Sequence, residues 1–536
     1  MNKMIEKKGR SGAPGYAMGS LFVYERGSYH PPHIRIKNTV IELERFETAK
    51  SAAIESLKEA YERTGRRAGA ANAEIFKAQQ MILLDEDYNE RIKNDILGGH
   101  MNAEWAVSEA SRYFYELFSG IHDEGVRAKA MDIKDIANKL MRILTGTEFV
   151  FDIKEPVILA ATYLSPSELI QIDRGMIKAL IMLEGSAYSH VVILAKTMGI
   201  PVVLGVDIRP GSNGYEAVID GHTGSVFINP GNDVKEKYRS LIDEEQARSL
   251  RLKEYIGREA VTQSGRKVSV LANIGGPSGA KAAIDNGCEG IGLVRTEFMF
   301  MDRDVLPTEE EHFKAYRDIV EKSQGRRVVF RTLDLGADKG MAINEENPAL
   351  GRRAIRICLT NRDIFIPQLK GLLRAAAYGD VAILYPMITS VAEMHCIADI
   401  LNETVDELTR DKVKYGKVKQ GIMIETPAAA MISDELAKEA DFFSIGTNDL
   451  TQFSLAIDRQ NSALARFYDP FHEGVMRMIG LTIENAHKAG IEVTICGELA
   501  SDLSITKRLI DMGVDALSVS PAAILPLKEY ICSLEQ

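Results

Sequence analysis

The sequence predicts a multidomain α/β protein: an N-terminal α/β domain with an inserted helical bundle, then a linker helix, then a C-terminal (β/α)8 barrel. Three observations predict this arrangement. The chain has 536 residues, which is too long for a single hydrophobic core. A stretch from about residue 40 to 144 is proline-poor and amphipathic. In the second half, short apolar segments alternate repeatedly with helical patterns.

The domain limits that we expect follow these changes of pattern. They are residues 1–25 with 148–232 for the α/β domain, 26–147 for the helical insertion, 233–262 for the linker and 263–536 for the barrel.

Composition and charge restrict the kinds of partner. Apolar residues make up 45% of the chain and charged residues 26%, which is ordinary for a soluble globular protein. The net charge of −11 argues against a nucleic-acid-binding surface, because such a surface needs a broad basic face. The five cysteines lack metal-binding spacing and suit a reducing compartment. With no recognisable signal peptide or membrane-spanning run, we expect a cytoplasmic protein.

The N-terminal part begins with turn-forming residues at 11–15, followed by an expected strand at Ser20–Tyr24. Between about Val40 and Leu144, apolar residues recur at spacings of three and four. This spacing predicts several long helices packed as a bundle. The pattern leaves two interpretations of the bundle open: a docking surface for a partner, or a structural insertion.

His190 lies where a small polar segment meets an apolar helical pattern. Apolar strands are expected at 157–160 and 179–183, and Glu184–Ser189 leads from the second strand into His190. The imidazole is therefore expected in the first turn of a helix, whose free N–H groups favour an anion. We interpret His190 as a phosphoryl acceptor; a histidine without chemistry is the alternative.

The second half has the size and period of a (β/α)8 barrel. Residues from about 233 to 259 are charged and helical in pattern, which is typical of a solvated linker helix. Apolar strands are then expected at 268–272, 290–294, 328–331, 381–385, 421–424, 442–445, 493–495 and 516–519. If the protein is an enzyme, its chemistry should lie at the C-terminal ends of these strands.

Charged and reactive residues occur at several of these strand ends. Strand ends carry Arg295, Arg331, Glu425, Asn448, Asp449 and Cys496, and the loops beyond carry Lys339 and Arg459. Arginine matches the oxygens of phosphate and carboxylate groups. Two carboxylates can hold Mg²⁺ and leave positions for substrate oxygens. A small phosphorylated acid fits both features, and a cysteine could move a proton to or from its carbon.

Five segments of the second half match the motifs of a known enzyme family. They are Gly292–Arg303 (GLVRTEFMFMDR), Leu306–Glu311 (LPTEEE), Glu425–Ala430 (ETPAAA), Asp441–Gln452 (DFFSIGTNDLTQ) and Cys496–Ala500 (CGELA). With these motifs the chain resembles Enzyme I of the bacterial phosphotransferase system, the phosphoenolpyruvate-protein phosphotransferases. The order of domains also matches, so the resemblance covers nearly the whole chain.

The resemblance implies a division of labour between the domains. The barrel would bind phosphoenolpyruvate through Arg295, Arg331, Lys339, Asn448, Asp449 and Arg459. Mg²⁺ would be held by Glu425 and Asp449, and Cys496 would protonate the enolate to pyruvate. His190 would attack phosphorus through Nε2 and pass the group to a histidine of the carrier protein HPr, docked on the helical insertion.

Further expectations follow from the same resemblance. The protein would catalyse the first step of sugar uptake and would form a homodimer through the barrel. Because one imidazole must visit two sites, the histidine domain would swing on its linkers, and the charged helix near residue 250 is the expected hinge.

Two segments depart from the family pattern. The family's histidine loop usually reads Gly-Gly-Arg-Thr-Ser-His, whereas Gly185–His190 lacks the arginine and the threonine. The loop after Lys339 is also shorter than in most members. The altered histidine loop motivates an alternative: a paralogue that senses phosphoenolpyruvate or serves a non-sugar phosphorelay. A pyruvate phosphate dikinase is disfavoured, because it needs a further nucleotide-binding domain of roughly 200 residues.

Overall fold

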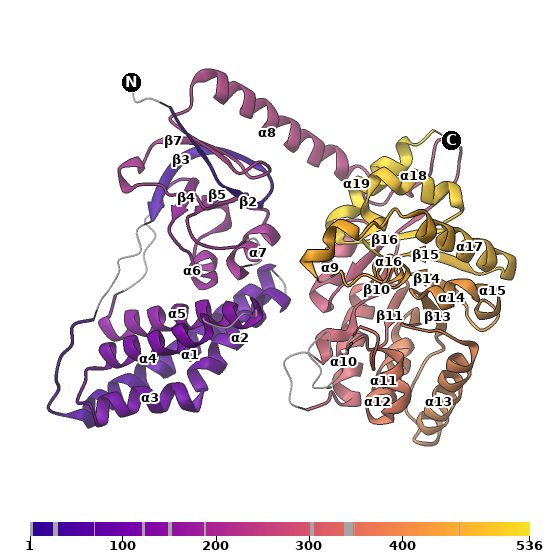
Figure 1. The fold of residues 1–536 in the computed structure, drawn as a ribbon, viewed down its shortest axis with the longest axis horizontal. Helices are drawn as coiled ribbons and strands as arrows, with labels where there is room; N and C mark the ends of the chain where they lie inside the picture. Colours follow the sequence, from indigo (N-terminus) through magenta and orange to yellow (C-terminus); the bar gives the residue numbers. More distant parts are fainter. Residues whose placement is uncertain are drawn as a thin grey trace. The chain divides into compact units, whose positions relative to one another are not determined.

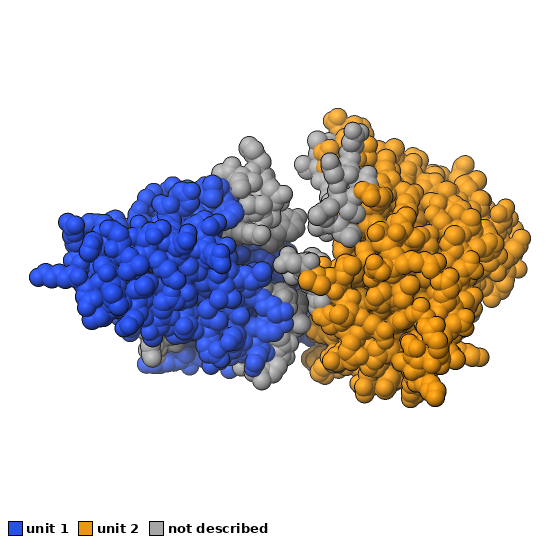
Figure 2. Space-filling view, turned by 90° about the horizontal axis from the view of Figure 1, so that it is seen from below, with its two compact units in different colours: residues 1–247 blue, residues 248–536 orange. Residues whose placement is uncertain are grey.

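The structure, a computed structural model, describes residues 4–24, 31–68, 70–119, 124–147, 153–186, 189–300, 305–336, 347, 349–459 and 461–535. The chain forms two compact units, residues 1–247 and 248–536 (Figure 2). The first unit combines a mixed β-sheet with a helical bundle, and the second is a closed barrel (Figure 1). The domain limits expected from the sequence stay predictions.

The described sheet of the first unit has the strand order β1-β8-β7-β3-β4-β5-β6-β2. Its centre is parallel: β3 (Tyr16–Tyr24), β4 (Val157–Ala161), β5 (Ile177–Met182) and β6 (Val202–Leu204). The other strands pair antiparallel: β1 (Ile5–Lys8), β2 (Arg10–Ala13), β7 (Glu216–Asp220) and β8 (Ser225–Ile228). The last four residues of β5 and all of β6 are buried, as expected for central parallel strands.

Two short helices connect the parallel strands. α6 (Pro166–Gln171) begins with a capping box between Ser165 and Glu168. α7 (His190–Thr197) joins β5 to β6, so His190 follows the C-terminal end of a buried strand, as the sequence predicted.

The edge of this sheet differs from the sequence-based expectation. Residues 11–13 were expected in a turn but belong to β2, where Ser11 pairs with Val203 of β6. β2 has a single buried residue, Ala13, so no alternating apolar pattern marks it as a strand. β3 also begins at Tyr16 rather than at Ser20. Backbone pairing with β6 therefore forms β2 although its own side chains show no strand pattern.

The proline-poor stretch forms a helical bundle, as predicted. Its helices are α1 (Thr39–Ala68), α2 (Ala70–Leu84), α3 (Glu86–Leu97), α4 (Ala103–Ser119) and α5 (Glu124–Thr145). Phe46, Phe76 and Val107 are fully buried between them. The same apolar cluster continues into β5 and α7, and α2 contacts α7 directly. The bundle and the sheet therefore share one core on the side of His190.

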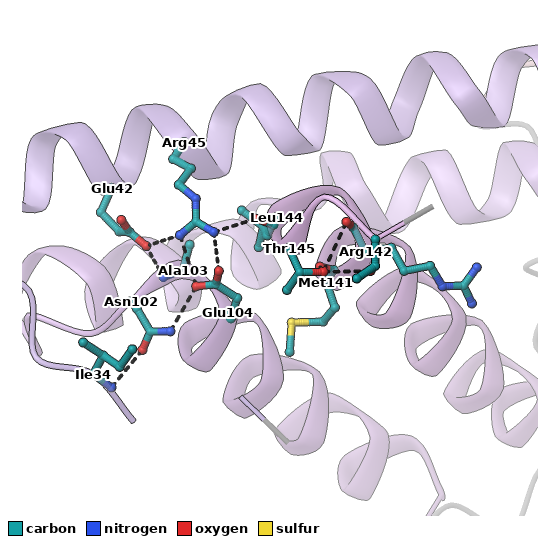
Figure 3. A network of polar contacts seen from close by, with 11 residues as sticks. Ile34, Glu42, Arg45, Asn102, Ala103, Glu104, Met141, Arg142, Leu144 and Thr145 are labelled. Atoms are coloured by element: carbon teal, nitrogen blue, oxygen red, sulfur yellow. Dashed lines mark hydrogen bonds and ion pairs between the residues drawn. The ribbon is translucent and has the colours of Figure 1, made fainter. Parts of the chain in front are cut away.

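A polar network around Arg45 ties three helices of the bundle together (Figure 3). Arg45 of α1 donates to Glu42 Oε1 at 2.9 Å, pairs with Glu104 of α4, and donates to the carbonyl of Leu144 in α5 at 2.6 Å. Leu144 lies in the last turn of α5, where carbonyl groups lack helical partners. Asn102 completes the network by donating to Glu104 Oε2 at 3.0 Å.

The charged segment after the sheet forms α8 (Asn232–Lys253). Tyr238 is its only buried residue, and its hydroxyl donates to Asp220 Oδ2 at 3.0 Å. From Glu244 to Arg251 the side chains are exposed, which agrees with the expected solvated helix. Among the described helices, none is long and apolar enough to span a membrane.

The second unit is the predicted barrel of eight parallel strands, closed by pairing of β16 with β9. The strands are β9 (Ser269–Ile274), β10 (Ile291–Val294), β11 (Val328–Arg331), β12 (Val381–Tyr385), β13 (Lys419–Ile424), β14 (Phe442–Ile445), β15 (Glu492–Ile495) and β16 (Ala516–Val519). The helices around them include α9 (Pro277–Asp285), α10 (Glu309–Lys322), α11 (Ile355–Thr360), α12 (Arg362–Ala375), α13 (Val391–Arg410), α17 (Glu473–Ala489), α18 (Leu503–Met512) and α19 (Ile524–Ser533).

The barrel interior is close-packed. A side chain at Gly292 would place its Cβ 2.4 Å from Ser518 Oγ, so only glycine fits at this point of β10. Leu293, Val329, Leu384 and Cys496 belong to one buried cluster formed by the strands. The barrel is therefore a core and not a pore, and chemistry is left to its rim.

Candidate active site

The C-terminal ends of the barrel strands carry the charged residues that the sequence singled out. Neighbouring strands run parallel, so these ends gather on one rim. Arg331 ends β11, and α16 (Thr447–Leu455) begins directly after β14. The residues brought to this rim are Arg295, Arg331, Glu425, Asn448, Asp449 and Cys496.

Arg331 is held between two carboxylates. Its Nη2 donates to Glu297 Oε1 at 2.6 Å, and its Nη1 lies 2.8 Å from Asp334 Oδ2. The Arg331 side chain is 9% exposed and that of Asp334 is fully buried. Burial opposes the positive charge, but Asp334 and Glu297 outweigh it and raise the pKa of Arg331. The guanidinium is therefore charged and fixed in direction.

Arg353 is a second buried guanidinium, and the sequence analysis missed it. It is 1% exposed, donates to Asp334 Oδ1 at 3.0 Å, and lies 3.9 Å from Asp449 Oδ1. Ala354 beside it has φ of +52°, a strained value for a residue with a side chain. Arg353 precedes α11 and follows no strand, so a search of strand ends could not find it.

Glu425 is buried beneath the rim. It is 1% exposed, and its Oε1 accepts from the backbone N–H of Met387 at 2.7 Å. Met387 has φ of +57°, so a strained backbone presents this donor. Burial, Asp449 and Asp334 raise the pKa of Glu425 to about 8, against the opposing effect of Arg331 and other cations. Burial and the neighbouring carboxylates therefore favour the protonated form of Glu425 over the charged one.

Asp449 supplies a buried oxygen with no hydrogen-bond donor among the described residues. Its Oδ1 is inaccessible to solvent, and the nearest cations are Arg459 Nη2 at 3.8 Å and Arg353 Nη1 at 3.9 Å. These distances allow attraction but no hydrogen bond. A buried carboxylate oxygen without a hydrogen-bond donor is suited to bind a positively charged ligand.

Glu425 and Asp449 fit a divalent cation that completes its shell with other oxygens. Burial and the nearby carboxylates raise the pKa of Glu425, and Asp449 Oδ1 has no hydrogen-bond donor among the described residues, so a cation would offset both. Mg²⁺ takes few protein carboxylates and keeps substrate or water oxygens. Among the described residues, no group of three or more His, Cys, Asp or Glu side chains could hold a metal alone. Two carboxylates would leave the remaining positions of such an ion to substrate or water oxygens.

Asn448 is fixed by the loop after β15. Its Oδ1 accepts from the N–H of Glu498 at 3.0 Å, and its carbonyl accepts from Tyr468 at 3.3 Å. This approach needs a glycine at Gly497, where a Cβ would lie 1.8 Å from Thr447 Oγ1. The two loops are thus locked at one point of contact.

Cys496 is a buried thiol in this rim. It is 5% exposed, and its Sγ accepts from the hydroxyl of Ser444 at 3.0 Å. Burial raises the pKa of Cys496 to about 11, while Ser444 has the opposite effect. The group is therefore a neutral thiol at physiological pH, able to give a proton but not to attack as a thiolate.

The remaining predicted residues are less enclosed. Arg295 is exposed at the end of β10, and within the described residues its side chain has no ion pair. Arg459 follows α16 and has a side chain 31% exposed. Lys339 lies outside the described residues. Arg295 and Arg459 are thus placed to meet a ligand arriving from solvent.

His190, the other predicted centre, lies in the first unit. It is the first residue of α7 and is exposed; Ser189 occupies the N-cap position. Surrounding protein still lowers the pKa of His190 below its ordinary value by desolvation, which favours the neutral imidazole. Ile193, one turn later, and Leu183, which directly follows β5, are exposed apolar residues after and before it in the chain. Ala187 and Tyr188 lie outside the described residues.

Three family models match the chain in succession. The model for "PEP-utilising enzyme, N-terminal" matches residues 8–129. The model for "PEP-utilising enzyme, mobile domain" matches residues 153–224, which include His190. The model for "PEP-utilising enzyme, PEP-binding domain" matches residues 250–536, which include the barrel.

Curated relatives match over nearly their whole length. A phosphoenolpyruvate-protein phosphotransferase of Bacillus subtilis is 36% identical over 542 residues, covering 99% of this chain and 95% of its own. One of Haemophilus influenzae is 38% identical, covering 97% of this chain and 92% of its own. One of Listeria monocytogenes is 36% identical, covering 99% and 94%.

Proposed function

The chain belongs to the phosphoenolpyruvate-protein phosphotransferase family, and from this premise we propose that it moves the phosphoryl group of phosphoenolpyruvate to His190 and then to a carrier protein. The observation that carries the proposal is the buried set of charges at the barrel rim. Arg331 and Arg353 are fixed by Asp334, which lies between them. Such fixed guanidinium groups suit a small dianionic substrate.

Substrate binding is assigned to the rim arginines and to Asn448. The fixed pair Arg331 and Arg353 would meet the phosphate and carboxylate oxygens, and the more exposed Arg295 and Arg459 would close on them from solvent. Charge neutralisation by groups held in place costs no reorganisation during the reaction. Lys339 remains a proposed contact on the ground of the family motif alone.

The metal site is assigned to Glu425 and Asp449. When bound there, Mg²⁺ would neutralise charge on the phosphate oxygens. The two carboxylates lie beneath the rim, and Met387 and Gly446 fix Glu425: its Oε1 takes the Met387 N–H, and a Cβ at Gly446 would lie 2.9 Å from its Oε2. The residues therefore hold the carboxylate in one direction.

The chemical step is a transfer followed by a protonation. Nε2 of neutral His190 attacks phosphorus, the bond from phosphorus to the enol oxygen breaks, and its electron pair goes to that oxygen. The Cys496 thiol gives its proton to the methylene carbon, which forms the methyl group of pyruvate. The thiolate then regains a proton from solvent. A pKa of about 11 keeps Cys496 protonated for this role.

Transfer requires His190 of one unit to reach the barrel of the other. α8 joins the two units, and its exposed stretch from Glu244 to Arg251 makes few contacts that would resist bending. We assign the hinge to this stretch, near residue 250. Motion between a barrel-bound and a carrier-bound position is then a rigid-body movement of the first unit.

The carrier is proposed to be HPr, docked on the helical bundle beside His190. α2 contacts α7, and Met81 and Leu84 of α2 are 66% and 62% exposed. Ile193 of α7 is 41% exposed. Apolar side chains left in solvent next to a transfer centre are typical of a transient protein interface. We further propose a cytoplasmic location, a homodimer formed through the barrel and a role in sugar uptake.

Transfer to the carrier is the experiment that tests this function. The enzyme is labelled with phosphoenolpyruvate carrying ³²P in the presence of Mg²⁺, freed of substrate, and mixed with purified HPr. We expect the label to move to HPr within the mixing time, and not to move to an HPr variant that lacks its acceptor histidine. Label that stays on the enzyme would favour the alternative, a phosphoenolpyruvate-sensing paralogue or another phosphorelay.

A further inference from the structure

We propose that Gln368 of α12 is a positioning residue for phosphoenolpyruvate binding, acting through the two carboxylates that hold Arg331. Gln368 is fully buried, and both ends of its amide are hydrogen-bonded to protein groups, so we assign it no contact with the substrate. Its amide instead joins the chain segment that follows β10 to the segment that follows β11. This inference rests on the proposed function of the rim.

The side chain of Gln368 forms three hydrogen bonds, which reach two segments of the rim and one helix. Oε1 accepts from the backbone N–H of Leu333 at 3.0 Å. Nε2 donates to Thr296 Oγ1 at 3.1 Å and to the hydroxyl of Tyr316 at 3.1 Å. Because a backbone N–H needs an acceptor, Leu333 fixes which end of the amide is oxygen. The nitrogen then has to face Thr296 and Tyr316.

The residues next to these contacts are the ones that hold Arg331. Glu297 follows Thr296 and Asp334 follows Leu333, and their carboxylates lie 2.6 Å and 2.8 Å from the Arg331 guanidinium. Thr296 Oγ1 also donates to the carbonyl of Arg331 at 2.8 Å. One amide thus sets the spacing of both carboxylates, and these set the direction of the guanidinium.

The Nε2 end of the Gln368 amide is held by Tyr316 of α10. The hydroxyl of Tyr316 lies 2.9 Å from Nδ1 of His312, and both residues are fully buried. α10 and α12 can approach this closely because of Gly371, one turn after Gln368, where a Cβ would lie 2.5 Å from the Cβ of His312. The network therefore connects the rim to two packed helices.

Burial makes the amide costly to replace. Thr296, Leu333, Tyr316 and Gln368 are all fully buried, so no water can take over a lost bond without rearrangement. Without Gln368, the N–H of Leu333 would lose its acceptor, and the segments carrying Glu297 and Asp334 could move apart. A small displacement of a binding group is enough to lose much of its effect.

The test compares Gln368→Met, which keeps the length of the side chain without polar atoms, with Asn485→Leu. Asn485 is a matched control: it is a buried amide of the same barrel, on α17, and donates to Ser433 Oγ at 2.9 Å, away from the rim segments. The readouts are the thermal midpoint, the phosphoenolpyruvate concentration for half-maximal labelling of His190, and labelling of His190 from phosphorylated HPr.

We expect Gln368→Met to raise the half-maximal phosphoenolpyruvate concentration about tenfold or more, by displacement of Arg331. Labelling from phosphorylated HPr should not change, because it does not use the barrel. Asn485→Leu should leave both labelling reactions unchanged at a comparable loss of thermal midpoint. Equal phosphoenolpyruvate dependence in the two variants would overturn the inference.

A conservative variant keeps the inference testable if Gln368→Met does not fold. Gln368→Glu can still accept from Leu333, and its protonated form can donate one bond. We expect its half-maximal phosphoenolpyruvate concentration to fall relative to wild type as the pH is lowered, since burial favours the protonated acid. A constant ratio to wild type would overturn the inference. Wild-type enzyme that phosphoenolpyruvate does not label would instead contradict the proposed function.

Discussion

The hydroxyl of Ser444 donates to Sγ of Cys496 at 3.0 Å inside the barrel, where Ser444 is 1% exposed. Ser444 lies in β14, and Cys496 directly follows β15, the neighbouring parallel strand. The register of the sheet therefore brings the two side chains into contact. A hydrogen bond to a thiol becomes stronger when the sulfur is negative. Ser444 is therefore placed to stabilise the thiolate that remains after Cys496 has given its proton.

Replacement of Ser444 by alanine should slow the release of pyruvate. Ser444 lowers the pKa of Cys496, so its loss makes the thiol a weaker acid. We expect about tenfold slower formation of pyruvate in a single turnover, consistent with a lost hydrogen bond to a charged group. The measurement is quenched-flow assay of pyruvate, and Cys496→Ala gives the lower limit. A rate equal to wild type would show that the hydrogen bond from Ser444 does not stabilise the thiolate.

The raised pKa of Glu425 should make the apparent affinity for Mg²⁺ depend on pH. Burial and Asp449 raise this pKa to about 8, so near neutral pH a proton competes with the metal. Deprotonation makes the carboxylate available, and the apparent affinity for Mg²⁺ should rise from about pH 6.5 to about pH 8.5. This affinity is measured from the Mg²⁺ concentration that gives half-maximal labelling of His190, determined at several pH values.

The same raised pKa has a consequence for stability. A carboxyl with a folded-state pKa above its ordinary value contributes stability at low pH, and this contribution is lost as the pH rises through about 8. Without metal, the thermal midpoint should therefore fall more steeply between about pH 4.5 and pH 8 in wild type than in Glu425→Gln, and the two slopes should converge above pH 8. Equal slopes would show that Glu425 titrates at its ordinary value.

Substitution of Gly497 tests the contact between the two loops that hold Asn448. A Cβ at this position would lie 1.8 Å from Thr447 Oγ1, so Gly497→Ala should destabilise the barrel by about 1–3 kcal/mol through overpacking. The matched control is Gly480→Ala, because a Cβ there meets no atom within 4 Å and lies inside α17. Chemical denaturation of both variants measures the difference. An equal free energy of unfolding would contradict the close approach.

Sequence reasoning found the residues that stand at strand ends and missed those that reach the rim from elsewhere. Arg331, Glu425 and Cys496 were found because a parallel barrel gathers its strand ends on one side. Arg353 lies before a helix and Gln368 inside one, and only packing brings them to the same groups. No pattern of spacing encodes such contacts.

The sequence also predicted those elements of the fold that carry an apolar pattern of their own. Apolar runs such as Val381–Tyr385 mark central strands, and the proline-poor stretch marks the bundle. The turn-forming residues at 11–15 predict a turn, whereas Arg10–Ala13 forms β2 because its backbone pairs with β6. Edge strands depend on a neighbour more than on their own side chains.

His190 is the residue proposed to accept the phosphoryl group from phosphoenolpyruvate, and one labelling experiment with histidine variants checks this role. Wild type, His190→Ala and the control His222→Ala, which alters an exposed histidine of the same unit, are incubated with ³²P-labelled phosphoenolpyruvate and Mg²⁺. The lowered pKa of His190 keeps its imidazole neutral, so labelling of wild type should persist at pH values slightly below 6.5, the ordinary histidine pKa. We expect acid-labile label on wild type and His222→Ala, and none on His190→Ala. Label of the same lability on His190→Ala would contradict this role.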